Sequence, residues 1–204
     1  MVRLPARIWS VDHDLQSLRA LGAARVVGEH VPRSSRVWAI GRHAEDRLYA
    51  RQGAPLGRRG KKGEKNQAVG RSRGGRNTKI HALADAKGRL IAILLTGGEA
   101  HDCPLAERLI RRVKSPERSL GDKAYDSAEL REQLGERGTK PVIPNRCNRK
   151  QPFSFNKRLY KMRWRIESAF NRLKDFRRIA TRYDRLARNY LASVCLAAAL
   201  LWWI

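Results

Sequence analysis

Four polar residues recur at helical spacing late in the chain. They are Tyr160, Arg163, Glu167 and Lys174, at successive offsets of three, four and seven. Because such offsets return to the same face of an α-helix, the spacing predicts one polar stripe along a helix of roughly four turns. A carboxylate flanked by cations suits a metal ion held beside a phosphodiester, since the acid ligates the metal and the cations bind phosphates. An ordinary ion pair between Arg163 and Glu167 is the simpler alternative for that part of the stripe.

A second candidate acid, Asp122, stands in the sequence Gly-Asp-Lys-Ala-Tyr after a short apolar run. Acids at the carboxyl ends of strands are where α/β sheets gather their ligands. Gly-Asp is also a common turn pair, and taken alone the pattern favours a surface turn. The local residues therefore leave the role of Asp122 open.

The elements that must position these residues follow a regular order from Thr78 onward. Two apolar-rich strands meet at Lys87-Gly88, which is typical of a hairpin. A helix, a strand, a helix, a strand, the stripe-bearing helix and a last helix from about Asp184 follow, which predicts a mixed α/β sheet with helices on its faces. The predicted ranges are 78–86 and 89–95 for the hairpin strands, 103–113 for a helix, 119–125 for a strand, 126–138 for a helix, 140–144 for a strand and 145–157 for a basic loop.

The polar stripe resembles the Y(2)R(3)E(6)K signature of DDE transposases from the insertion-sequence 4 and 5 families, and it matches at all four positions. The run from Gly121 to Ser127 (GDKAYDS) resembles the second-acid motif of the insertion-sequence 5 type. The FNRLK run over 170–174 is also similar to this family, and the resemblance covers about Asn66 to Leu201. It implies an RNase H-like (retroviral integrase-like) fold, a mixed α/β sheet with helices on both faces.

The resemblance also implies a catalytic centre in which three acids hold two divalent ions, Mg²⁺ or Mn²⁺. One ion activates water or a 3′-hydroxyl, and the other stabilises the leaving oxygen. Asp122 and Glu167 match the second and third acids, so we expect both to be catalytic and to bind metal.

DNA contacts are implied on two segments. In the stripe, the cations would contact phosphates and the tyrosine would pack near the scissile strand. The block from Gly70 to His81 (GRSRGGRNTKIH) lacks the strand-to-helix context of a P-loop, and it resembles a family signature suited to the DNA backbone. The expected DNA-binding residues are Tyr160, Arg163, Lys174, Arg71, Arg73, Arg76 and Lys123. For His101-Asp102, a pair that the family shares, a structural role is favoured over metal ligation.

The first acid of the family has no match in this sequence. Asp46 lies at about the expected distance, but its setting (EDRLYAR) is not an apolar strand, and we do not assign it. We therefore expect the RNase H-like sheet to lack its first strand. The chain would then divide into an irregular segment over residues 1–65 and an incomplete catalytic domain over residues 66–204.

A shifted reading frame would explain this gap. Suitable codons for residues 46–60 and for residues 8–22, each read one nucleotide later, spell sequences similar to the family's first-acid motif and N-terminal segment. We hypothesise that residues before about Gly60 are translated out of frame and that Lys61-Lys62 marks the slip. Sequencing the gene tests this, since the shifted frame must encode transposase sequence.

Composition restricts the partners and the compartment. The formal net charge of +25 predicts a polyanionic partner, most simply nucleic acid. Cys103, Cys147 and Cys195 have no metal-ligand spacing and are expected to be reduced thiols of a cytosolic protein. The apolar segment 190–204 is shorter than the roughly 20 residues that span a membrane, so we expect a core helix and no membrane partner.

These observations predict a transposase that binds the terminal inverted repeats of an insertion sequence and its target DNA, in the bacterial cytoplasm at the nucleoid. It would catalyse metal-dependent strand cleavage and transfer as an oligomer on paired ends, although this chain alone is expected to be inactive. A non-catalytic DNA-binding protein or regulator of transposition is the alternative. A basic RNA-binding structural protein is disfavoured by the acid motifs at Asp122 and Glu167.

Overall fold

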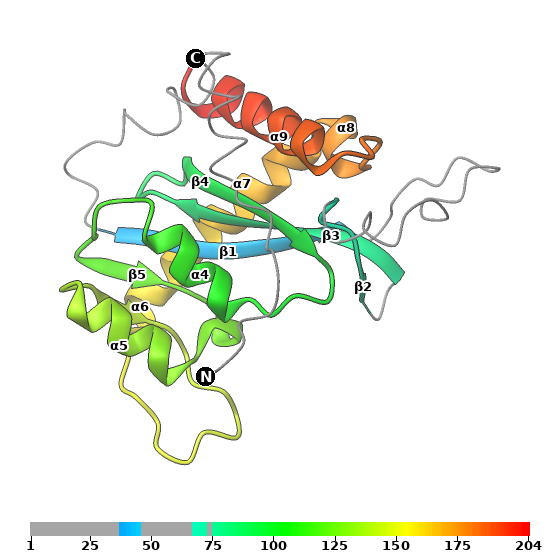
Figure 1. Ribbon diagram of the computed structural model, residues 1–204. Helices are drawn as coiled ribbons and strands as arrows, with labels where there is room; N and C mark the ends of the chain where they lie inside the picture. The colour runs from blue at the N-terminus through cyan, green and yellow to red at the C-terminus, as the bar shows by residue number, and fades with distance from the viewer. Residues whose placement is uncertain (1–36, 46–66, 73–74) are drawn as a thin grey trace.

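A single mixed sheet with helices on both faces forms the body of the molecule (Figure 1). The computed structural model describes residues 37–45, 67–72 and 75–204, with the side chains of 42–45 left out. The strands are β1 Val37–Glu45, β2 Gly70–Ser72, β3 Gly75–Ala84, β4 Leu90–Gly97, β5 Arg118–Leu120 and β6 Lys140–Val142. Their order is β2-β3-β1-β5-β6, and β4 also pairs with β3.

The pairing directions identify the sheet type. β1 is antiparallel to β3, and β3 is antiparallel to β4. On its other side β1 is parallel to β5, and β5 is parallel to β6. Three antiparallel strands continued by parallel strands give the RNase H-like arrangement that the resemblance implied, with β1 at the centre.

The presence of β1 corrects the prediction that the first strand is missing. Trp38, Ala39 and Ile40 of this strand are at most 4% exposed, so the strand is part of the core. The strand was missed in the sequence because its apolar run is short and is followed directly by Gly41-Arg42 within an Arg-rich segment. The predicted irregular segment therefore does not extend over residues 37–45. Residues 1–36 and 46–66, where the rest of that prediction and the frame-shift hypothesis fall, lie outside the described residues.

Alternation along the central strands divides the interior into two cores. Ala39 and Ile80 point to the face covered by α7 and α9, whereas Trp38 and Ile40 point to the face covered by α4 and α5. This is the expected consequence of a side-chain period of two in a sheet buried on both faces. The helices are α4 Cys103–Ile110, α5 Ala128–Glu136, α6 Lys157–Tyr160, α7 Trp164–Lys174, α8 Arg177–Ala180 and α9 Ala187–Trp202, with short 3₁₀ turns η1 Lys123–Tyr125 and η2 Lys161–Arg163.

The predicted hairpin between β3 and β4 is confirmed. Asp85 closes its turn by accepting hydrogen bonds from the backbone N–H groups of Lys87 and Arg89 at 2.9 and 3.0 Å. Gly88 has φ of +83°, which a residue without a Cβ adopts without strain. The turn thus follows from the Asp-x-x-Gly chemistry of its sequence.

The predicted C-terminal core helix is α9, which packs one face against the sheet. Tyr190, Val194 and Ala198 are fully buried, whereas Leu196 and Leu200 are 55% and 58% exposed. Within the part of the chain that the structure describes, none of the helices combines the length and the apolar character needed to cross a membrane.

Candidate active site

Asp122 lies at the carboxyl end of β5, the edge of the sheet where the sequence placed it. Its backbone is extended and it caps η1, with Oδ1 accepting a hydrogen bond from the N–H of Ala124 at 2.7 Å. Capping satisfies a backbone donor that the short 3₁₀ turn leaves without a partner. The capping contact fixes the carboxylate at the end of the strand.

Glu167 lies in the first turn of α7, and its side chain is 53% exposed. It forms an ion pair with Arg163, whose guanidinium lies 5.7 Å from the ring centroid of Tyr160. The predicted stripe is therefore a chain of contacts over these three residues. Lys174 is exposed at the last residue of the helix.

The stripe runs through three short elements, where one helix was expected. α6 ends at Tyr160, η2 forms the next turn and α7 begins at Trp164. A 3₁₀ turn has 3.0 residues per turn in place of 3.6, so it shifts the direction of the side chains only modestly. Arg163 and Glu167 remain within ion-pair distance across this junction.

The flank of α7 that carries Glu167 faces away from α9. Ile166, Ala169, Phe170 and Leu173 point into the core. Arg172 lies on one flank of that buried stripe, with its guanidinium 5.6 Å from the ring of Trp202 in α9. The helical period puts Glu167 on the opposite flank. Since α9 packs on β4 and α7 packs on β1, Glu167 faces the half of the sheet that contains β5.

Gly41 in β1 is the point where the two acids' elements meet. Ala39 pairs with Leu120, so two residues further along these parallel strands Gly41 is level with Asp122. A Cβ added to Gly41 would lie 3.0 Å from Ile166 Cδ1 and 3.1 Å from Phe170 Cε2. Helix α7 therefore packs directly on the backbone of β1, through Ile166, which precedes Glu167, and Phe170, one turn further along. The structure brings the second and third predicted acids to the same part of the sheet.

A third carboxylate does not join them among the described residues. Within that part of the chain, no three His, Cys, Asp or Glu side chains are grouped so that they could hold a metal ion. Position 41, at about the level of Asp122, is a glycine at which an added Cβ would lie only 3.0 to 3.2 Å from Ile166 and Phe170. Two carboxylates suit Mg²⁺, which commonly takes one or two acids together with substrate phosphates. They do not supply the three-acid set of a two-ion centre.

The predicted arginine block forms the β2–β3 hairpin. Arg71 pairs directly with Arg76 across the two strands, and both side chains are exposed. Arg73 lies outside the described residues. Lys123 is exposed in η1, immediately after Asp122.

The base of this hairpin is tied to the rest of the fold by Arg182, which the sequence did not single out. The side chain is 2% exposed and donates to the carbonyl oxygens of Gln67 and Ala68 at 2.8 and 3.3 Å. Thr78 Oγ1 donates to Ala68 O at 2.7 Å. Burial lowers the pKa of the Arg182 guanidinium, against the opposing effects of Tyr190 and Asp184. These contacts fix the direction in which the hairpin presents its arginines.

The His101-Asp102 pair separates in the structure. Asp102 is 9% exposed and its Oδ1 lies 3.5 Å from Lys79 Nζ, which also donates to Ala100 O at 2.7 Å. Asp102 directly precedes α4, and its carbonyl accepts the first N–H groups of that helix. His101 is exposed. The contacts of Asp102 are those of a residue that holds the β4–α4 connection against β3.

Asp126, between η1 and α5, is a second buried acid. It accepts hydrogen bonds from Arg131 Nε, Arg149 Nε and the N–H of Arg146 at 3.0, 2.8 and 2.8 Å. Burial raises the pKa of this carboxyl, but the bonds from Arg149, Arg146 and Arg131 outweigh burial and hold the pKa below its ordinary value. Ser127 caps α5, with its side chain accepting the N–H of Leu130.

Comparison with known proteins gives the same family at several levels. Residues 49–202 match the family described as Transposase DDE domain. A Brucella ovis protein named "Putative transposase for insertion sequence element IS6501" is 36% identical over 127 residues, which cover 61% of this chain and 97% of that protein. A Neisseria meningitidis serogroup B transposase for insertion sequence element IS1106 is 30% identical over 128 residues, 58% of this chain and 44% of that protein.

Among solved structures, the fold is similar to that of a piggyBac transposase in a synaptic complex with hairpin DNA. The TM-score is 0.53 at 13% sequence identity, over 92% of this chain and 50% of that chain. At this identity the likeness concerns the fold alone. The chain thus spans about half the length of this structure and less than half of the Neisseria relative.

Proposed function

The chain belongs to the DDE transposase family, and from this premise we propose that it is a DNA-binding transposase chain of an insertion sequence of the insertion-sequence 5 type. The observation that supports the proposal is the position of β1, which pairs with β5 before Asp122 and packs at Gly41 against the α7 residues Ile166 and Phe170. Its substrates would be the terminal inverted repeats and the target DNA, at the bacterial nucleoid. A homo-oligomer would hold paired ends.

The stripe on α6, η2 and α7 supplies the DNA contacts nearest the acids. Arg163 neutralises Glu167 in the free protein, and its planar guanidinium also suits bidentate binding of a phosphate. Lys174 lies about two turns further along the same flank and would contact the backbone as a point charge. Tyr160, which packs under Arg163, would lie near the scissile strand.

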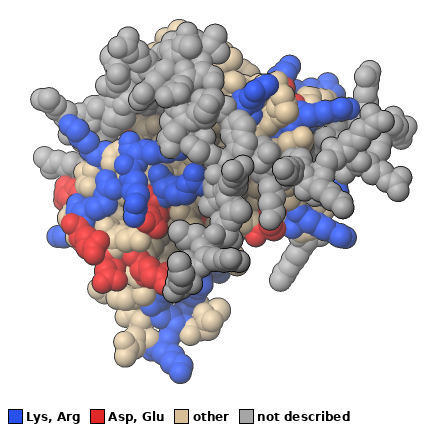
Figure 2. Space-filling view, viewed as in Figure 1, with Lys and Arg blue, Asp and Glu red and all other residues tan. Residues whose placement is uncertain are grey.

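The β2–β3 hairpin supplies a second set of backbone contacts. Like charges directly opposite each other destabilise an antiparallel pair, so a cross-strand Arg71–Arg76 pair favours a polyanion in front of it. Arg73 at the hairpin turn and Lys123 beside Asp122 would extend this contact. Figure 2 shows Lys and Arg side chains on several parts of the surface, in keeping with the net charge of +25.

Members of the DDE transposase family use divalent metal ions, and we propose Mg²⁺ or Mn²⁺ for this chain, held by Asp122 and Glu167. A bound ion of this kind supplies electrophilic stabilisation to the reacting phosphate. The protein's own residues position that phosphate and balance its charge. The second ion of a complete centre requires a third acid, which the described residues do not provide.

We further propose that this chain alone does not cleave DNA, because the strand position level with Asp122 is the crowded Gly41. The first test is DNA binding measured by fluorescence anisotropy with and without Mn²⁺. A metal-holding transposase chain binds duplex DNA more tightly with Mn²⁺, and Asp122→Asn removes that gain. A non-catalytic regulator, the alternative reading, binds equally with and without the ion, and that result would count against the proposal.

A further inference from the structure

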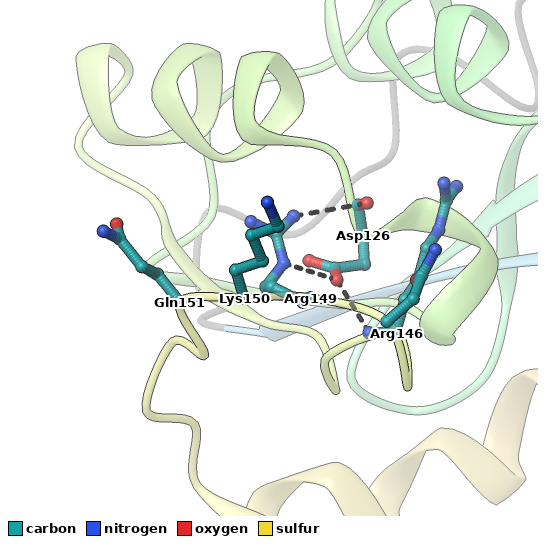
Figure 3. Close-up of a pocket in the computed structure, with 6 residues that line it drawn as sticks. Asp126, Arg146, Arg149, Lys150 and Gln151 are labelled. Carbon is teal, nitrogen blue, oxygen red and sulfur yellow. Dashed lines mark hydrogen bonds and ion pairs between the residues drawn. The ribbon is translucent and has the colours of Figure 1, made fainter.

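The loop between β6 and α6 carries a basic pocket that the proposed function leaves without a role (Figure 3). It has a volume of about 450 Å³, within the range of ligand sites. Its lining consists of Asp126, Arg146, Asn148, Arg149, Lys150 and Gln151, all polar or charged. The lining contains three cationic side chains and one acidic side chain, so the pocket suits an anion and not an apolar ligand.

The loop is closed at its base by a pair of hydrogen bonds. Asn145 Nδ2 donates to Phe153 O at 2.8 Å, and the N–H of Phe153 donates to Asn145 Oδ1 at 3.0 Å. The Phe153 ring packs under two guanidinium groups, those of Arg131 and Arg149, at 4.6 and 4.9 Å from its centroid. Cation–π contacts of this kind hold both side chains in place.

Asp126 organises the pocket from below. Its side chain is fully buried and forms ion pairs with Arg131 and Arg149 while it accepts the backbone N–H of Arg146. Figure 3 shows this carboxylate between the Arg149 and Arg146 segments of the loop. The carboxylate of Asp126 therefore serves to hold the loop in place. The side chains of Arg146 and Lys150 are exposed on the surface of the loop. A loop fixed before its ligand arrives avoids most of the ordering cost of binding.

The same loop is attached to the segment that carries Asp122. Arg146 Nη2 donates to Ala124 O at 3.0 Å, and the N–H of Ala124 donates to Asp122 Oδ1 at 2.7 Å. Arg146 Nε also reaches Lys123 O at 3.3 Å. The pocket and the candidate catalytic acid thus lie on either side of the three-residue turn η1.

We propose that the loop over residues 145–151 is a phosphate-binding site that holds the backbone of the DNA strand next to Asp122. Arg146 and Lys150 provide the contacts, and Asp126 is the positioning residue that fixes the loop. The ligand is a phosphodiester of DNA, an assignment that rests on the proposed function. Such a contact positions the strand and carries no sequence information.

The test is the salt dependence of duplex binding by the full chain, between about 50 and 200 mM KCl. The logarithm of the affinity falls linearly with the logarithm of the salt concentration, and the magnitude of this slope decreases by about 0.9 for each phosphate contact that is lost. Lys150→Gln is expected to lower the slope by about 0.9, and Arg146→Gln/Lys150→Gln by about 1.8. Lys150 is the safer single change, because its side chain is exposed and lies outside the Asp126 hydrogen bonds.

A matched control is Lys114→Gln/Lys140→Gln. It removes the same charge from exposed positions before β5 and at the start of β6, the opposite ends of these strands from Asp122. The slope of this control is expected to equal that of the wild type. Equal slopes for the loop variants and the control would overturn the phosphate site while leaving the proposed function intact. A wild-type chain that does not bind duplex DNA would overturn both.

Cys147 gives an independent readout, because it is exposed within the same loop. Saturating duplex DNA is expected to slow the alkylation of Cys147 severalfold, as measured by peptide mass spectrometry. The wild type and the control variant should both show this protection, and Arg146→Gln/Lys150→Gln should lose it. An alkylation rate that DNA leaves unchanged in the wild type contradicts the proposal.

Discussion

At the scale of single residues, the candidate site could be predicted as far as its motifs extend. Asp122 and Glu167 are flanked on both sides by residues that resemble the family's motifs, and their elements, β5 and α7, both contact the central strand β1. The Arg163–Glu167 ion pair, offered as the simpler alternative, is also present. The Asp126 cluster was not predicted, because its partners come from positions 5, 20 and 23 residues away along the chain. No local period reveals contacts of that kind.

Glu167→Gln should affect DNA binding in opposite directions with and without metal. Removing the negative charge frees Arg163 for phosphate, so affinity without divalent ion should rise by a few-fold, equivalent to about 1 kcal/mol. With Mn²⁺ the variant should lose the metal-dependent gain. Anisotropy titrations of duplex DNA measure both effects. Glu107→Gln, which breaks the exposed Arg111 ion pair on α4, is the charge-matched control and should leave the metal-dependent gain unchanged.

Asp126→Asn should destabilise the fold, because it leaves buried Arg131 without its counter-charge. Removing one member of a buried ion pair costs about 3–5 kcal/mol. Urea denaturation at pH 7 measures this loss. The exposed Glu107→Gln control should change the free energy of unfolding by no more than about 1 kcal/mol.

The same carboxyl should make stability depend on pH at the acid end. Its pKa in the folded chain lies below the ordinary value of 3.8, because the bonds from Arg149, Arg146 and Arg131 outweigh burial. Its stabilisation is therefore fully present above about pH 4 and is lost as the pH falls through the lower native value. Melting temperatures of the wild type should fall steeply in that window. If the melting temperature of Asp126→Asn falls with decreasing pH as steeply as that of the wild type, other groups control the stability in acid.

At the scale of elements, the strands and helices after Thr78 could be predicted from periodicity and turn chemistry. The hairpin at Gly88 and the acid-bearing connection after β5 follow directly from their sequences. β1 could not, because a four-residue apolar run at Val37–Ile40 is too short to distinguish from an irregular segment. Its place in the sheet is determined by long-range pairing with β3 and β5.

The contact between β1 and α7 can be tested with Gly41→Ala. The new Cβ would lie 3.0 Å from Ile166 Cδ1 in a packed core, and overpacking of this kind costs about 1–3 kcal/mol. Chemical denaturation should show a loss in that range. Ile166→Val removes the obstructing methyl group, so the double variant should recover part of the loss.

Gly135→Ala is the control for this change, because a Cβ there meets nothing within 4 Å in helix α5. Replacing an unconstrained helical glycine by alanine stabilises by about 0.5–1 kcal/mol. The two Gly→Ala changes are therefore expected to differ in sign. A neutral or stabilising Gly41→Ala would mean that α7 does not press on β1 as described.

The β2–β3 hairpin is the second element whose role can be measured. Arg71→Gln/Arg76→Gln should lower the salt slope of duplex binding by about 1.8, with each arginine contributing one phosphate contact. Anisotropy titrations across salt concentrations provide the slope. The Lys114→Gln/Lys140→Gln variant serves again as the control. If the hairpin variant has the same salt slope as this control, the hairpin does not contact the DNA.

At the scale of the whole molecule, the fold consists of one sheet between two cores, with basic segments projecting at separate places. The β2–β3 hairpin, the α6–α7 stripe and the loop over residues 145–151 come from distant parts of the sequence. The net charge of +25 predicted a polyanion without indicating where it binds. The structure distributes part of that charge over these three segments, of which the loop over residues 145–151 is hydrogen-bonded to the turn that follows Asp122.

We propose that Asp122 and Glu167 are two acids of a DDE centre, and no third acid joins them among the residues that the structure describes. The decisive measurement is a nicking assay on a duplex of the terminal repeats, with the purified chain and Mg²⁺ or Mn²⁺. We expect DNA binding without strand cleavage, for the wild type and for Asp122→Ala alike. Metal-dependent cleavage by the wild type that Asp122→Ala abolishes would contradict it.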